Sequence, residues 1–153
     1  MPRTILICTD GSPRAEAALR AGLEVLAAAD RVVIASVVEP LDPGLVVGTG
    51  MAGGVMTPSE ALVMQSGVQD HGQDAVDRLR TDLGIPDAEL QVLTGSPGTA
   101  ICDLATELGA SAIVIGSRGR GGFRRAVLGS VSDHVVRHAP CPVVVTTIHD
   151  EDV

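Results

Sequence analysis

The chain has 153 residues, which is the size of one domain with a hydrophobic core of its own, and we expect a single domain over residues 1–153. It carries 11 basic residues, all of them Arg, against 19 acidic ones, and the net charge of −8 argues against general binding to DNA. Phe123 is the one aromatic residue, which argues against a protein that stacks single-stranded bases on rings. We therefore expect no nucleic-acid partner.

The complete absence of Lys removes several classes of chemistry that need an ammonium group. It excludes Schiff-base enzymes, P-loops that end in Gly-Lys-Ser/Thr, and phosphorelay receiver domains. The three cysteines, Cys8, Cys102 and Cys141, are odd in number and lie in apolar runs, which predicts buried reduced thiols rather than a disulfide framework or a zinc site. The first residues are too few for a signal peptide and no apolar run approaches the ~20 residues of a membrane span, so we expect a cytoplasmic protein.

Short apolar runs alternate with longer segments of helical periodicity, and this alternation is typical of repeated βαβ units. The predicted fold is an α/β protein with an open, twisted, parallel sheet of five strands and helices on both faces. The expected strands are Thr4–Cys8, Arg31–Val38, Glu89–Thr94, Ala112–Gly116 and Pro142–Ile148. The expected helices begin near Ser12, cover Ser59–Leu83 with Ser59 as the N-cap, run from about Ser96 or Pro97 to Leu108, and begin again at Gly129-Ser130.

The segment Glu39–Pro58 is long, irregular and rich in Gly and Pro. Loops of this length in a compact domain are usually functional or disordered. The sequence leaves two interpretations open for it: a flap that covers a helix, or a lid or partner surface.

In open α/β sheets, ligands bind beyond the carboxyl ends of the strands, so the residues that follow each strand are the candidate site. Thr9-Asp10-Gly11-Ser12 follows the first strand, and a glycine-rich loop follows Gly116 and leads to Gly129-Ser130-Val131-Ser132. The window 108–132 contains four Arg and no acidic residue, so it carries +4 in a chain of −8. Glycines and a helix N-terminus expose N–H groups to an anion, and Ser130 and Ser132 add hydroxyl donors. The alternative is an ordinary glycine-rich loop that binds no ligand, in which Ser130 serves only as the N-cap of the helix.

At this point a resemblance becomes specific. Gly116-Ser117-Arg118-Gly119, nine further residues and Gly129-Ser130 match the G-x-x-G-x(9)-G-[ST] motif of the universal stress protein family. Thr9-Asp10-Gly11-Ser12, Ser36–Pro40 and Cys141–Val145 resemble other blocks of that family, in the family's order, and the resemblance covers essentially the whole chain. Cys8 departs from the family, since many relatives have Pro before the aspartate.

The resemblance implies a sheet order of 3-2-1-4-5 and an ATP-binding member of the family. Asp10 would lie near the ribose and phosphates, the Val37 backbone would bind the adenine edge, Ile115–Gly119 would wrap ribose and phosphate, and Gly129–Ser132 would hold phosphates. The candidate cofactor-binding residues are Thr9, Asp10, Val37, Ile115, Gly116, Ser117, Arg118, Gly119, Gly129, Ser130, Val131 and Ser132. The cofactor would be ATP, or ADP or AMP, with Mg²⁺ or Mn²⁺ brought in on the phosphates and no metal ligand assigned to the protein.

Other kinds of binding or catalytic site have less support in the sequence. The G-x-G-x-x-G pattern of a dinucleotide-binding domain is absent after the first strand, and neither Ser96 nor Ser130 sits in a G-x-S-x-G elbow. His134 and His138 are one helical turn apart and could bind a metal, but without a third ligand nearby we favour solvated or capping histidines.

Two functional classes remain: a nucleotide-gated regulatory module of the stress response, read by protein partners not identified by the sequence, and a slow ATPase or nucleotidyl-transfer enzyme. We favour the first, because Asp10 and Glu39 are the only carboxylates expected at the strand ends and no catalytic base is evident. The apolar fifth strand would lie at a sheet edge, and the resemblance predicts a homodimer through it.

Overall fold

Strands and helices alternate along the chain in the computed structural model, which describes residues 2–13, 19, 20, 22, 29–40, 56–117 and 128–147. The strands are β1 (Thr4–Cys8), β2 (Arg31–Val38), β3 (Glu89–Thr94), β4 (Ala112–Gly116) and β5 (Val143–Thr146). The helices bounded within the described ranges are α3 (Pro58–Leu83), α4 (Pro97–Leu108) and α5 (Ser130–His138). The first four strands have the bounds predicted from the sequence.

All five strands are parallel and form one sheet in the order β3-β2-β1-β4-β5, which confirms the predicted fold class and strand order. The chain first builds outward from β1 through β2 to β3, and then crosses to the other side of β1 for β4 and β5. The strand order therefore reverses between β1 and β4, and a crevice forms at such a reversal beyond the carboxyl ends of the strands.

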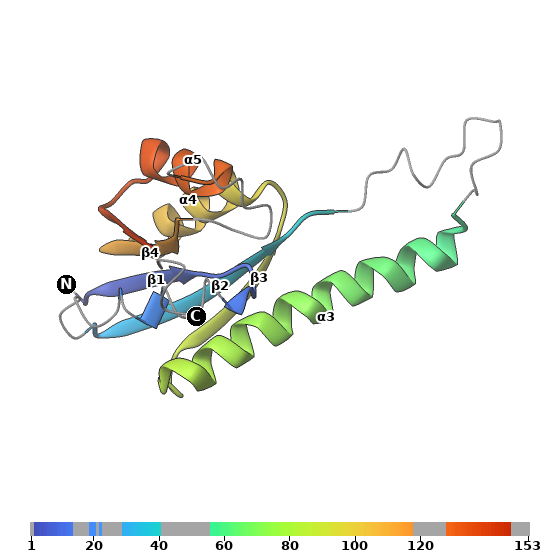
Figure 1. Ribbon diagram of the computed structural model, residues 1–153, viewed down its shortest axis with the longest axis horizontal. Coiled ribbons are helices and arrows are strands. Elements are labelled where there is room, and N and C mark those ends of the chain that lie inside the picture. The colour runs from blue at the N-terminus through green and yellow to red at the C-terminus, as the bar shows by residue number, and fades with distance from the viewer. Residues whose placement is uncertain are drawn as a thin grey trace.

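The sheet separates two layers of helix, as Figure 1 shows. Successive side chains of β1 alternate between these layers because the side-chain period of a strand is two residues. Leu6 and Cys8 pack in a core with α4 and α5, whereas Ile5 and Ile7 pack in a second core with α3. Both faces of β1 are buried, which explains why its sequence is a continuous apolar run.

Helix α3 begins earlier than the sequence analysis expected, because the N-cap is Thr57 and not Ser59. Thr57 Oγ1 accepts from the Glu60 N–H at 3.2 Å, and the Glu60 carboxylate accepts from the Thr57 N–H at 2.7 Å. This reciprocal pair is a capping box, with Pro58 at the first helical position. These hydrogen bonds from Thr57 lower the pKa of the Glu60 carboxyl. The predicted end of the helix is confirmed, with Gly84 in the left-handed conformation at φ 65°.

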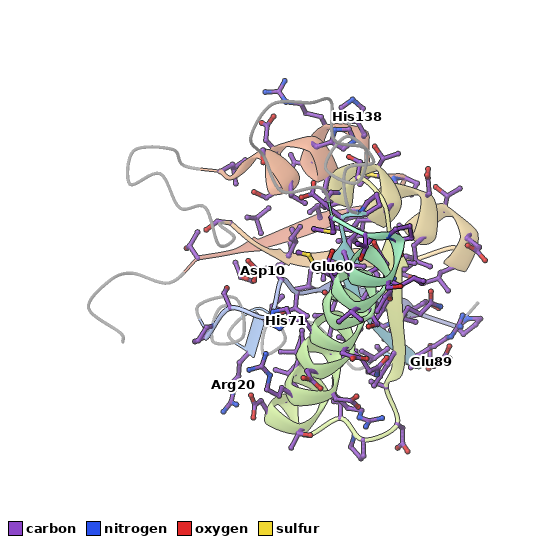
Figure 2. The ribbon with its side chains drawn as sticks, turned by 90° about the vertical axis from the view of Figure 1, so that its right-hand side faces the viewer. Asp10, Arg20, Glu60, His71, Glu89 and His138 are labelled. Carbon is purple, nitrogen blue, oxygen red and sulfur yellow. The ribbon has the colours of Figure 1, made fainter. Side chains whose placement is uncertain are left out.

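Helix α3 is longer than the sheet that it covers. Its 26 residues span about 39 Å, whereas the eight residues of β2 span about 26 Å. Its buried residues, Gly72, Ala75, Val76 and Leu79, all lie in its second half, and its first turns extend past the sheet. In the view turned by 90°, the helix crosses one face of the sheet while His138 lies on the opposite side (Figure 2). Leu62 and Val63 on the overhanging turns are about seven-tenths exposed, at 72% and 71%.

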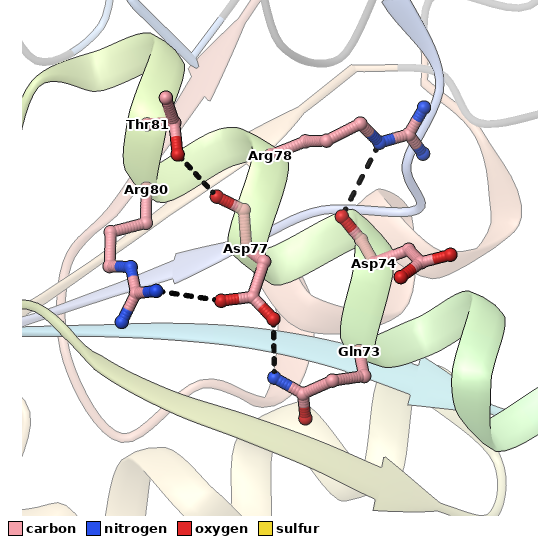
Figure 3. Close-up of polar contacts among 6 residues, drawn as sticks. All are labelled: Gln73, Asp74, Asp77, Arg78, Arg80 and Thr81. Carbon is pink, nitrogen blue, oxygen red and sulfur yellow. Dashed lines mark hydrogen bonds and ion pairs between the residues drawn. The ribbon is translucent and has the colours of Figure 1, made fainter.

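The solvent side of the second half of α3 carries a chain of polar contacts (Figure 3). The Asp77 carboxylate accepts from Gln73 at 2.9 Å and from Arg80 at 2.8 Å, and its backbone carbonyl accepts from the Thr81 hydroxyl at 3.0 Å. Each exposed pair of this kind contributes only about 0.2–0.5 kcal/mol to a helix. The attachment of α3 therefore depends on its buried apolar face. Although long enough, it is too polar to be a membrane-spanning helix, and none occurs in the described part of the chain.

The last strand is shorter than the predicted Pro142–Ile148. Pro142 precedes β5 and its carbonyl accepts from the Ile113 N–H at 3.0 Å, while Thr147 follows the strand and Ile148 lies outside the described residues. The expected helix after Ser12 is described only at Pro13, Leu19, Arg20 and Gly22, which are helical. The segment 41–55, which includes most of the predicted irregular segment, also lies outside the described residues.

Two glycines of α3 provide a test of how closely this helix lies on the sheet. A Cβ at Gly72 would lie 2.8 Å from Cγ1 of both Val38 and Val92, whereas a Cβ at Gly67 would meet no described atom within 4 Å. We expect Gly67→Ala to leave the free energy of unfolding unchanged or to raise it by up to about 1 kcal/mol. Gly72→Ala should lower it by about 1–3 kcal/mol, because the helix must shift from the sheet. Urea denaturation measures both, and equal effects would contradict the close contact.

Candidate functional site

The first part of the site is the turn that ends β1. The Thr9 N–H donates to the Ala35 carbonyl at 3.0 Å, and this is the last backbone bond from this end of β1 to β2 that the structure records. The Gly11 N–H then donates to Thr9 Oγ1 at 3.0 Å, and the Ser12 N–H donates to Asp10 Oδ1 at 3.0 Å. Gly11 adopts φ 73°, a left-handed conformation that favours glycine. These bonds turn the chain away from the sheet.

Asp10 is left with a buried acceptor. Its Oδ2 atom is buried and has no hydrogen-bond partner among the described residues. A buried carboxylate oxygen without a donor is costly, and each such group in a native protein needs an explanation. At the carboxyl end of the central strand, a donor from a bound molecule would supply the missing partner.

The second part is the end of β2, which runs three residues past the last pair of the β1 ladder, Cys8 with Ala35. In a parallel ladder, alternate residues of a strand direct their N–H and C=O groups to the same side. Ala35 accepts from Thr9 and Val38 accepts from Gly95, so the backbone of Val37 faces the β1 side. If β1 continued, Gly11 would donate to Val37, but Gly11 donates to Thr9 instead. The half-buried Val37 thus presents its backbone to the space that β1 leaves.

The third part is the junction between β4 and α5. Ser117 is buried, its N–H donates to the Thr146 carbonyl at 2.8 Å, and its carbonyl accepts from the Gly129 N–H at 2.7 Å. The Ser132 hydroxyl lies 3.0 Å from the carbonyls of Ser117 and Gly129. These bonds bring Ser117 and Gly129, twelve residues apart in sequence, to one point at the carboxyl edge of the sheet. Arg118 and Gly119, with the rest of the arginine-rich loop, lie outside the described residues.

Helix α5 begins at this junction without a capping side chain. Its N-cap is Gly129, in extended conformation, and the cap makes no side-chain hydrogen bond. The alternative that Ser130 is an N-cap is therefore wrong: Ser130 is the first helical residue and its side chain is exposed. The N–H groups of the first turn of a helix have no intrahelical partner and carry the positive end of the helix dipole. They are suited to an anion.

The structure thus brings most of the predicted residues to one edge of the sheet. Thr9 and Asp10 follow β1, Ile115 and Gly116 end the adjacent β4, and β1 and β4 are hydrogen-bonded neighbours. In the first turn of α5, Val131 is half-buried and Ser132 is only 2% exposed. The Ser132 hydroxyl was expected to be a phosphate donor, but here it faces two backbone carbonyls. Its role toward phosphate stays a prediction.

Among the described residues, no group of three or more His, Cys, Asp or Glu side chains is placed to hold a metal ion. All three cysteines are free. Cys8 and Cys102 are buried as predicted, whereas Cys141 is only half-buried, and burial is the main cause that raises the pKa of all three thiols. Thiols with a raised pKa are weak nucleophiles and weak metal ligands.

The family model that matches this chain is the universal stress protein family, over residues 1–147. The chain belongs to the universal stress protein family. Universal stress protein MJ0531 of Methanocaldococcus jannaschii is 31% identical over 146 residues, which cover 94% of this chain and 81% of the relative.

Solved structures agree with this assignment. The hypothetical protein MJ0577, assigned a biochemical function from its structure, has a TM-score of 0.75 and 21% identity over 98% of this chain and 99% of its own. The universal stress protein of Archaeoglobus fulgidus, solved in complex with dAMP, has a TM-score of 0.54 and 26% identity over 95% of this chain and 98% of its own. The predicted family and fold are therefore confirmed.

The junction of this universal stress protein can be tested with two serines of one helix. Ser132→Ala removes a buried donor to the Ser117 carbonyl and should lower the free energy of unfolding by about 1 kcal/mol. Ser130→Ala is the matched control, because its exposed side chain should contribute less than about 0.5 kcal/mol. Thermal or urea denaturation without ligand compares them. A larger loss for Ser130→Ala would contradict the described junction.

Proposed function

We propose that this universal stress protein binds an adenine nucleotide, with ATP as the principal ligand, in the crevice between the ends of β1 and β4. The buried Asp10 Oδ2 atom carries the proposal, because it is a strong acceptor without a partner at the topological switch point of the sheet. A ribose hydroxyl, or a water molecule on phosphate-bound Mg²⁺ or Mn²⁺, would donate to it. The dAMP complex of the Archaeoglobus relative supports the class of ligand.

The surrounding groups would divide the ligand between them. The backbone of Val37 on the β1 side would supply one donor and one acceptor, the pair that the edge of an adenine ring requires, and aliphatic side chains would take the place of aromatic rings. The uncapped N-terminus of α5, with Gly129, Ser130, Val131 and Ser132, would hold the phosphates. Arg118 and Gly119 complete the predicted set from the loop that Ser117 and Gly129 flank.

We infer a regulatory role rather than rapid turnover. Fast phosphoryl transfer requires a positioned base on the attacking water. Asp10 already accepts from Ser12, and Glu39, the other carboxylate expected at the strand ends, is exposed. Bound nucleotide would then set the conformation that protein partners of the stress response read. The free thiols fit a reducing cytoplasm.

Removal of the Asp10 charge should change nucleotide binding and stability in opposite directions. We expect Asp10→Asn to weaken ATP binding about 10- to 100-fold, the effect of one lost charge-assisted hydrogen bond. Without nucleotide, the variant should be as stable as the parent or more stable, because the charge on a buried carboxylate oxygen without a donor is removed while the acceptor for Ser12 is kept. Calorimetry with ATP and Mg²⁺ measures the affinity, and urea denaturation measures the stability.

The matched control is Asp103→Asn, which makes the same change of charge at an exposed position of α4 and should leave the affinity within twofold. Nucleotide recovered after the titration should still be triphosphate. Equal ATP affinity of the parent and Asp10→Asn would refute the site. Rapid release of phosphate by the parent, lost in Asp10→Asn, would refute the regulatory role in favour of an ATPase.

We also propose a homodimer through β5, which is an edge strand of the sheet. Pro142 and Thr146 accept hydrogen bonds from the β4 side, so by alternation the N–H of Val145 faces outward. A two-fold axis would pair this edge with its own copy in antiparallel orientation.

Val145→Pro removes one of the two outward donors of β5, those of Val143 and Val145, without removing a donor to β4, so we expect it to convert the dimer to a monomer in light scattering. Val92→Pro is the matched control, since by the same alternation its N–H faces outward on the opposite edge strand, β3. This control should leave the dimer intact. A dimer that survives Val145→Pro but not Val92→Pro would place the interface on β3.

A further inference from the structure

The hydroxyl of Thr9 competes with the sheet for a backbone donor. Thr9 is the first residue after β1 and is only 7% exposed. Its own N–H still donates to β2, to the Ala35 carbonyl at 3.0 Å. Its Oγ1 atom, however, accepts from the Gly11 N–H at 3.0 Å, two residues later in the chain. Threonine hydroxyls in such turns give the backbone an alternative to the ladder of a sheet.

The acceptor that loses this donor is the carbonyl of Val37. Cys8 is paired with Ala35 in the parallel ladder, so Val37 is the next residue of β2 whose backbone faces β1. In a longer ladder, the N–H of Gly11 would donate to the Val37 carbonyl. Within the described part of the chain, no backbone N–H from the β1 side donates to this carbonyl. The acceptor is free because Thr9 holds its natural donor.

A free carbonyl beside a free N–H can distinguish one purine from another. The edge of adenine offers the 6-amino group as a donor and N1 as an acceptor, whereas a purine without the amino group offers only N1. A site built to accept from a ligand N–H rejects an analogue that lacks it, because the acceptor of the protein is then left unpaired. The Val37 carbonyl is therefore the group suited to recognise the amino group.

We propose that Thr9 is a positioning residue that determines base specificity without touching the nucleotide. Its hydroxyl keeps the Gly11 N–H away from the Val37 carbonyl, which then accepts from the 6-amino group of adenine. Gly11 adopts φ 73°, so the chain can turn back to the hydroxyl at this residue. The inference rests on the nucleotide site proposed above and assigns one of its residues an indirect role.

Thr9→Val removes the hydroxyl acceptor and keeps a β-branched side chain that favours extended backbone. The buried Gly11 N–H then needs another acceptor, and the Val37 carbonyl is the one that the ladder supplies. Calorimetry with Mg²⁺ compares ATP with purine riboside triphosphate, which lacks only the 6-amino group. The parent should bind ATP about fivefold more tightly than the analogue, and in Thr9→Val this preference should fall below about twofold.

Three further variants separate the lost acceptor from general damage to the site. Thr9→Ser keeps the hydroxyl and should keep the preference of the parent. Thr9→Ala lacks the hydroxyl without the β-branched side chain and should lose the preference as Thr9→Val does. Thr4→Val is the matched control, because it makes the same change at a buried residue, 3% exposed, at the opposite end of β1. It should keep the preference, and circular dichroism checks the fold of each variant.

A measurement without nucleotide tests the same exchange of hydrogen bonds. In a sample labelled with ¹⁵N and ¹³C, a coupling through the hydrogen bond between the Gly11 nitrogen and the Val37 carbonyl carbon should appear in Thr9→Val. The parent and Thr9→Ser should not show it.

The outcomes distinguish this inference from the proposed function. The inference is overturned, and the nucleotide site is kept, if Thr9→Val retains the preference for ATP, weakens both nucleotides by the same factor, or shows no such coupling. Loss of the preference in Thr4→Val or Thr9→Ser would also overturn it. A parent protein that binds neither nucleotide would refute the proposed function, and the specificity role of Thr9 with it.

Discussion

The early end of β1 is the constraint on which the rest of the site depends. The central strand leaves the sheet after Cys8, while β2 continues to Val38. The side chain of Thr9 makes this possible, because its hydroxyl accepts the Gly11 N–H that would otherwise continue the ladder. One side-chain hydrogen bond and one left-handed glycine thus end the central strand early, so the backbone of Val37 on β2 has no partner from β1.

The junction of β4 and α5, on the other side of β1 from β2, depends on a different set of hydrogen bonds. The N–H of Ser117 is anchored to β5 and its carbonyl to the start of α5, so β4, β5 and α5 meet at a single residue. The buried Ser132 hydroxyl adds a third contact to this point. Since these bonds are internal, the N-terminus of α5 is positioned before any ligand arrives. Preorganised donors of this kind cost little reorganisation when an anion binds.

The sequence predicted the strands well because their signal is strong: both faces of β1, β2 and β4 are covered, and such strands are continuous apolar runs with turn residues at each end. The sequence analysis was wrong at the helix starts, where two nearby residues are both suitable as the N-cap. Thr57 and Ser59 are both good N-cap residues, and only the Glu60 carboxylate, three residues after Thr57, distinguishes them. At α5, Gly129 and Ser130 are both acceptable N-cap residues. The hydrogen bond from the Gly129 N–H to the Ser117 carbonyl favours Gly129.

The site could be predicted as a set of residues, but not as hydrogen bonds. Strand order and the glycine spacing indicated which residues follow β1 and β4. The sequence could not indicate that Ser132 faces carbonyls, because its orientation depends on Ser117, fifteen residues earlier. Nor could it indicate that the ring of His134 lies on Gly98, a contact between two helices that depends on how α4 and α5 pack. Long-range contacts of this kind follow from the packing of the sheet, and local patterns do not record them.

The nucleotide binding proposed for this acidic chain requires that local charge, and not the net charge, determines the affinity for phosphate. At physiological salt, exposed charges more than about 8 Å apart are largely screened, so distant acidic residues contribute little to the potential at one site. The unpaired N–H groups in the first turn of α5 would act at short range. The unpartnered Asp10 oxygen opposes phosphate at the same edge, and this conflict is resolved if the carboxylate faces a ribose hydroxyl or a hydrated cation. Asp10 would then determine how the nucleotide lies in the crevice, while α5 provides the attraction for the phosphates.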